Sequence, residues 1–167
     1  AYALACPEND VTLRDLAALC DIFYIGGTKC GALLGEAVVI PQPGLIPHFF
    51  TIIKQHGALL AKGRLLGVQF DALFTDGLYF EISRHAIEMA ERMKQVFIAH
   101  GFKFETESPT NQQFVILTDA QKETLEKRYI FEPMGKSADG GNIARFCTSW
   151  ATTEEEVQTL IDDLKAL

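Results

Sequence analysis

The stretch Asp21-Ile-Phe-Tyr-Ile-Gly-Gly-Thr-Lys-Cys-Gly-Ala-Leu-Leu-Gly-Glu-Ala-Val-Val-Ile40 decides the fold class of this chain. Its ends, residues 21–25 and 37–40, are almost continuous apolar runs, the pattern of strands whose two faces are both covered by helices. Between them lies a loop of small residues that holds Lys29, the first lysine of the chain. We therefore expect an α/β protein in which two strands present a lysine on the loop that joins them.

Lys29 is a candidate nucleophile if its amine is shielded from water. Burial disfavours the charged ammonium form, so the neutral amine becomes available. A neutral amine is what condensation with an aldehyde to a Schiff base requires. The alternative is a solvated lysine at the tip of a hairpin. Neither common phosphate-loop motif fits, because the glycines begin no GxGxxG and Thr28 precedes the lysine instead of following it.

Hydrophobic periodicity predicts that helices and strands alternate along the rest of the chain. A first helix is expected over 12–20, where Thr12 and Asp15 can form a capping box. A last helix is expected after Thr153, with Glu156 as the capping partner. Between them we expect helices over 45–56, 58–74, 78–100 and 119–128, and strands near 102–105, 114–117, 129–132 and 142–148.

The composition argues against several classes of function. The chain has 167 residues, of which 48% are hydrophobic, and this is ample for one ordinary core. A net charge of −7 with scattered basic residues argues against nucleic acid as a partner. No apolar run approaches the ~18 residues of a membrane span, and the first residues lack the pattern of a signal peptide. We expect a soluble cytoplasmic protein with no membrane partner.

Cysteine and histidine spacing gives no metal motif. The four cysteines form no CxxC pair and stand among apolar or small residues: Cys6, Cys20, Cys30 and Cys147. We therefore expect buried, reduced thiols rather than disulfides or zinc ligands. The four histidines also lack the spacing of metal ligands, so no metal is expected.

Two later segments give the lysine loop its context. They read Gly57-Ala-Leu-Leu-Ala-Lys-Gly-Arg-Leu-Leu-Gly-Val-Gln-Phe70 and Ile143-Ala-Arg-Phe-Cys-Thr-Ser-Trp-Ala-Thr-Thr-Glu-Glu-Glu-Val157. Together with the lysine loop they resemble the threonine aldolase and aromatic amino acid β-eliminating lyase family, and the resemblance runs over essentially the whole chain. It implies an α/β fold, namely the C-terminal part of a fold type I pyridoxal-phosphate enzyme. Residues 1–78 would be the end of the cofactor-binding large domain with linking helices, and residues 79–167 a small C-terminal α/β domain.

The resemblance also implies roles for individual residues. Lys29 would bind pyridoxal 5'-phosphate through a Schiff base, and Arg64 would approach the cofactor phosphate, often from a neighbouring subunit. Arg145 would clamp the substrate carboxylate. The planar fork of a guanidinium suits both anions. Thr28 is a further candidate, because its hydroxyl can donate to the phosphate or orient the amine. Each arginine also has an ordinary structural alternative: a solvated position for Arg64, and a pairing with an acidic neighbour for Arg145.

The implied reaction is the retro-aldol cleavage of L-threonine or L-allo-threonine to glycine and acetaldehyde, a carbon–carbon lyase activity of amino-acid metabolism. The family pattern reads Ser-Lys-Gly where this chain has Thr28-Lys29-Cys30, so β-elimination from an amino acid stays as an alternative. Family members are roughly twice as long and form homodimers or homotetramers with shared active sites. We therefore expect a piece of a longer enzyme that is inactive alone, or a non-catalytic fragment that only folds or dimerises.

Overall fold

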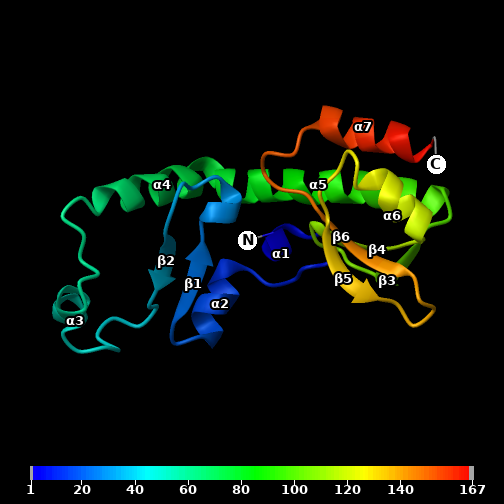
Figure 1. The fold of residues 1–167 in the computed structure, drawn as a ribbon. Helices are drawn as coiled ribbons and strands as arrows, with labels where there is room; N and C mark the ends of the chain where they lie inside the picture. The colour runs from blue at the N-terminus through cyan, green and yellow to red at the C-terminus, as the bar shows by residue number, and fades with distance from the viewer. Residues whose placement is uncertain (1, 166–167) are drawn as a thin grey trace.

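The computed structural model describes residues 2–165 and contains two antiparallel sheets joined along one long helix (Figure 1). The helices are α1 (Tyr2–Ala5), α2 (Leu13–Leu19), α3 (Phe49–Gln55), α4 (Arg64–Phe74), α5 (Leu78–Ala99), α6 (Asp119–Leu125) and α7 (Glu154–Leu164). The strands are β1 (Phe23–Gly26), β2 (Glu36–Val39), β3 (Lys103–Thr106), β4 (Gln112–Leu117), β5 (Glu132–Lys136) and β6 (Asn142–Cys147). Two short 3-10 turns, η1 (Thr28–Cys30) and η2 (Thr75–Gly77), complete the order.

Helix α5 packs against both sheets and contributes to two separate apolar cores. Near its start, Tyr79 is fully buried with Ile25 and Cys30 beside the β1–β2 hairpin. Near its end, Phe97 is fully buried against the other sheet. In Figure 1, α5 runs above the larger sheet, and α4 continues along the same line above the β1–β2 hairpin. The apolar residues at helical spacing that predicted α5 are the ones it buries.

The larger sheet has the strand order β3-β4-β6-β5, with every neighbouring pair antiparallel. One face packs on α5 and α7 through residues such as Val115, Phe146 and Leu160. The alternation of buried and half-buried residues along β4 reflects this one-sided burial. Side chains at the intervening positions, including Arg145, therefore belong to the face opposite the core.

The β1–β2 hairpin is covered on only one face. Its inner residues, such as Ile25, pack on the core near Tyr79. On the other face Tyr24 and Val38, which are register partners, are 71% and 60% exposed. The expectation that helices cover both faces is therefore wrong for this chain, because the described residues supply apolar partners for one face and leave the other in solvent.

Some predicted boundaries are also wrong. Helix α4 begins at Arg64 instead of residue 58, because residues 58–62 are exposed and have no packing to hold them helical. Strand β5 begins at Glu132 rather than near 129, and all of its residues are exposed on the sheet edge. The expected burial of all the thiols fails at Cys147, which is exposed at the end of β6. Both predicted capping boxes, at Thr12 and Thr153, are present.

Within residues 2–165, no helix is both long enough and apolar enough to cross a membrane. The same residues contain no cluster of histidine, cysteine or acidic side chains suited to a metal ion.

The substitution Phe97→Ala tests the core between α5 and the larger sheet. Phe97 is fully buried, and its ring packs against the rings of Phe102, Phe104 and Phe146. We expect the free energy of unfolding to fall by about 3–5 kcal/mol, because the lost ring leaves a cavity. Chemical denaturation measures the change. The neighbouring Ile98→Ala is the control: that side chain is 49% exposed and should cost about 1 kcal/mol or less. Equal costs at the two positions would contradict this packing.

The substitution Glu156→Gln tests the cap of α7. The Thr153 backbone N–H donates to Glu156 Oε2 at 2.8 Å, and this bond and that from the Thr153 hydroxyl hold the pKa of the Glu156 carboxyl below its ordinary value of 4.5. The stabilisation is complete above pH 4.5 and is lost as pH falls through the lowered pKa, because the unfolded chain takes up the proton first. We expect the variant to lose less stability than the parent on acidification below pH 4.5, as measured by denaturation at several pH values. An unchanged acid dependence would refute the carboxylate cap.

Candidate active site

The candidate lysine stands on the 3-10 turn η1, which joins β1 to β2. The turn is closed by the N–H groups of Cys30 and Ala32, which donate to the Gly27 carbonyl at 2.9 and 3.0 Å. It directs Cys30 into the core, where the residue is 1% exposed, and leaves Thr28 and Lys29 exposed. The shielding of the lysine amine expected from the sequence is therefore not found in this chain, because only the Cys30 side of the turn meets other described residues.

Helices α4 and α5 hold this turn from behind. The Tyr79 hydroxyl donates to the Gly26 carbonyl at 3.1 Å. Burial, reinforced by the neighbouring Cys30, raises the pKa of the Tyr79 phenol, so the hydroxyl keeps its proton and remains a donor. Gly27 packs so closely on α4 that a Cβ there would lie 2.9 Å from the Phe70 ring. A side chain at position 27 would push the turn away from α4.

Arg145 lies in β6 with donors that the described chain leaves unused. Its Nη1 donates to Gln112 Oε1 at 3.2 Å, while its buried Nε has no partner. Glu132 is opposite in register, yet no acidic side chain of residues 2–165 forms an ion pair with Arg145 within 4.0 Å. Leaving a guanidinium N–H unsatisfied is costly, so the group is suited to an anionic ligand such as a carboxylate.

In the folded chain, the charges of Lys29 and Arg145 both act on the thiol of Cys147. Packing around the sulfur raises the pKa of the Cys147 thiol, and the positive charges of Arg145 and Lys29 both act in the opposite direction. Two residues more than a hundred positions apart in the sequence thus act on the same group. This arrangement could hold a small molecule with one aldehyde-reactive and one anionic part.

Arg64 is not part of this arrangement within the described chain. It is the first residue of α4 and lines a separate exposed hollow with Lys62, Leu65 and Val68. Phe70, the residue of α4 that packs on Gly27 of the lysine turn, lies about 9 Å further along the helix axis.

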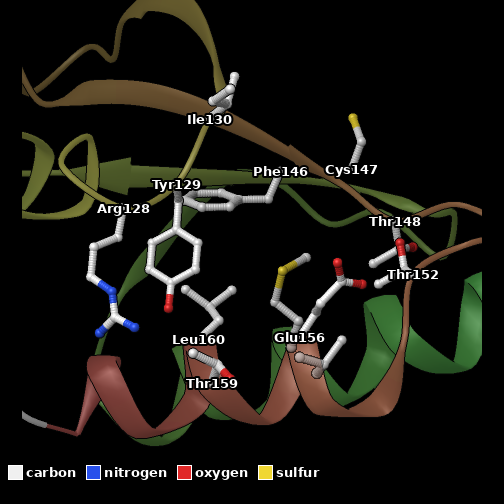
Figure 2. A pocket seen from close by; sticks show the side chains of 12 residues that line it. Arg128, Tyr129, Ile130, Phe146, Cys147, Thr148, Thr152, Glu156, Thr159 and Leu160 are labelled. Carbon is white, nitrogen blue, oxygen red and sulfur yellow. The ribbon is translucent and has the colours of Figure 1, made fainter.

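A different hollow of about 370 Å³ lies between β6, α7 and residues 128–130 (Figure 2). Its floor is apolar, with Phe146 and Leu160, and Arg128 and Glu156 lie at its rim. Neither Lys29 nor Arg145 lines it, so it is not the candidate active site.

Sequence reasoning missed three residues that hold the candidate site together. Tyr2, Tyr79 and Trp150 all contact the lysine turn, and although Trp150 lies in a segment that carries the family resemblance, no role was assigned to any of the three from the sequence. Gln112, in contrast, could have been found from strand alternation once the pairing of β4 with β6 was known.

Comparison with known proteins gives these residues a context. No protein-family model matches the chain. It is 28% identical over 169 residues to a low specificity L-threonine aldolase of a Pseudomonas species, covering 98% of this chain and 46% of that protein. A low specificity L-threonine aldolase of Pseudomonas aeruginosa is 29% identical and covers 87% of this chain and 41% of that protein. The chain thus spans about half the length of the curated relatives it matches.

Solved structures agree with the sequence matches. Leishmania major threonine aldolase superposes with a TM-score of 0.90 at 42% identity, covering 98% of this chain and 48% of that one. Sphingomonas wittichii serine palmitoyltransferase, at 15% identity and a TM-score of 0.61, shares the fold over 90% of this chain and 40% of its own. The resemblance inferred from the sequence is confirmed: over nearly its whole length the chain is similar to threonine aldolases and has the fold of part of a fold type I pyridoxal-phosphate enzyme.

Proposed function

We propose that this chain is part of a pyridoxal-phosphate-dependent lyase that cleaves L-threonine or L-allo-threonine to glycine and acetaldehyde. The observation that carries the proposal is that Lys29, on a turn fixed by α4 and α5, and Arg145, whose Nε lacks a partner, both act on the Cys147 thiol. They do so in a chain that is 42% identical to a threonine aldolase of Leishmania major.

Each residue has a defined part in this proposal. The Lys29 amine, exposed in the described chain, would hold the cofactor through a Schiff base. Arg145 binds the substrate carboxylate through its Nε and a second guanidinium nitrogen. Holding both ends of the amino acid would limit the orientations that its Cα can adopt in the site. Pyridoxal phosphate, when bound, supplies the electron sink for the cleaved bond. The Thr28 hydroxyl would donate a hydrogen bond to its phosphate.

The active enzyme contains more polypeptide than this chain, and we propose that it is a homodimer or homotetramer with shared active sites. Two observations support this. Lys29 is exposed and one face of the β1–β2 hairpin is uncovered, so further protein is needed to exclude water from the site. Around Arg64, the side chains of Leu60, Leu65 and Val68 are 52%, 66% and 44% exposed, as suits a protein–protein contact that would bring this arginine to a neighbouring subunit's cofactor. Alone, the chain would hold cofactor poorly.

The substitution Lys29→Ala tests the covalent role. In the complete enzyme we expect it to abolish borohydride-trapped pyridoxal phosphate and threonine cleavage, because no other amine stands on the fixed turn. Peptide mass spectrometry locates the trapped cofactor. Lys54→Ala, which removes an exposed lysine on α3, is the matched control and should trap cofactor normally. Trapping that persists at another lysine in the Lys29 variant would reject the assignment.

The substitution Arg145→Lys tests carboxylate binding. Lysine keeps the charge but lacks the planar fork, so we expect kcat/KM for threonine to fall by about 10- to 100-fold, mostly through KM. Steady-state kinetics measure the change, and Arg84→Lys, on an exposed position of α5, is the control. A variant with an unchanged KM would show that another group binds the carboxylate.

The products separate the two candidate reactions. A threonine aldolase releases acetaldehyde from threonine, whereas a β-eliminating lyase releases pyruvate and ammonia from a β-substituted amino acid. The departure at Cys30 from the family pattern makes both measurements necessary. Release of pyruvate without any acetaldehyde would replace the aldolase proposal with the lyase.

A further inference from the structure

The Tyr2 hydroxyl joins the lysine turn to the loop that follows β6. It donates a hydrogen bond to the Lys29 carbonyl and accepts one from the Trp150 backbone N–H at 3.2 Å. Tyr2 thus satisfies one backbone acceptor and one backbone donor, 27 and 148 positions away in the sequence. A single phenol that connects two such distant segments fixes their separation more tightly than either bond would alone.

The Trp150 ring makes a second contact between the same two segments. A Cβ built on Gly31 would lie 3.8 Å from Trp150 Cδ2 and 3.9 Å from Cε2, so the indole lies directly against the lysine turn. Gly31 has φ 95°, a left-handed conformation that favours glycine. The turn therefore has Tyr2 bonded to its carbonyl and Trp150 packed on its glycine.

The loop that carries Trp150 is itself anchored near Arg145. The Thr148 hydroxyl donates to the Ala86 carbonyl of α5 at 2.6 Å. The Asn111 side-chain amide donates to the Thr148 carbonyl at 2.7 Å. Only Phe146 and Cys147 separate Thr148 from Arg145, and both lie at the end of a paired strand. A contact that fixes the position of Trp150 therefore also restrains β6, the strand that carries Arg145, through a short segment that is itself hydrogen-bonded.

We propose that Tyr2 and Trp150 form a clasp of positioning residues that sets the distance between the Lys29 amine and the Arg145 guanidinium. The inference rests on the proposed function, because it assigns the clasp a task in a site that needs both groups. Neither residue touches the reacting atoms. Their effect is to hold the lysine turn where its amine can reach a molecule whose carboxylate is bound by Arg145.

The test is Tyr2→Phe, which keeps the ring and removes the hydroxyl. In the complete protein we expect hydrogen exchange at the Trp150 amide to accelerate about tenfold, because its acceptor is lost. Exchange at the Met93 amide, in the buried middle of α5, should not change and serves as the internal reference for global folding. The matched control is Tyr24→Phe, which alters an exposed tyrosine on the neighbouring β1 and should leave Trp150 exchange as it is.

Two further readouts test the positioning role. Trp150 is the only tryptophan of these 167 residues, and collisional quenching of its fluorescence should increase in Tyr2→Phe. The rate at which borohydride-trapped pyridoxal phosphate appears on Lys29 should fall by about tenfold in Tyr2→Phe and in Trp150→Ala. Trp150→Phe, which keeps a flat ring over Gly31 and the backbone donor, should restore a rate close to that of the parent.

The outcomes separate the clasp from the proposed function. Unchanged exchange at Trp150 in Tyr2→Phe would overturn the clasp itself. Faster exchange with an unchanged trapping rate would overturn the positioning role while the proposed function stands. If the parent protein traps no pyridoxal phosphate on Lys29 at all, the proposed function fails, and the positioning role fails with it, even where exchange confirms the hydrogen bond.

Discussion

The continuity of helix α5 is the constraint on which the geometry of this chain depends. Its first turn is buried beside the hairpin through Tyr79, and its last turns are buried under the larger sheet through Phe97. The two cores share no buried residue, so the helix backbone is their main physical link. Lys29 is on the turn beside one core and Arg145 is in the sheet that covers the other, so their relative position depends on this helix of 22 residues and on the contacts of Tyr2.

The candidate site leaves polar groups unsatisfied where the rest of the fold satisfies them. The capping boxes of α2 and α7 pair donors with acceptors at the helix starts. Arg145, in contrast, keeps a buried Nε without a partner, and Lys29 stands on a turn whose backbone is bonded while its amine is exposed. Such incomplete satisfaction is typical of sites that bind a ligand, because the ligand completes the bonds. Without a ligand, the positions of Arg145 and Lys29 therefore depend on the packing of the residues around them.

The parts of the fold that were predictable depend on neighbours in sequence. Thr153 and Glu156 form the expected cap because a capping box needs only four consecutive residues. Helix α5 was predictable because its apolar spacing is regular over many turns. The start of α4 at Arg64 was not, since residues 58–62 have suitable helix formers and only the lack of packing leaves them as a loop.

For the candidate site, too, some features could be predicted from the sequence and others could not. Lys29 and Arg145 could be proposed from residue type and family resemblance, and their roles stay predictions. The exposure of the lysine could not be predicted, because it depends on which segments cover η1. Nor could the contacts of Tyr2, which are set by residues 27 and 148 positions away.

Because α5 is long, a small bend in it displaces one end appreciably relative to the other. With a rise of about 1.5 Å per residue, its 22 residues extend about 33 Å, so a bend of about 5° at the midpoint would shift one end by about 1.4 Å relative to the other. A misplacement of about 1 Å can reduce turnover by about 10²-fold. Ala90 is 1% exposed near the centre of the helix, so a larger side chain there would displace the helix and change the separation of Lys29 and Arg145 without touching either residue.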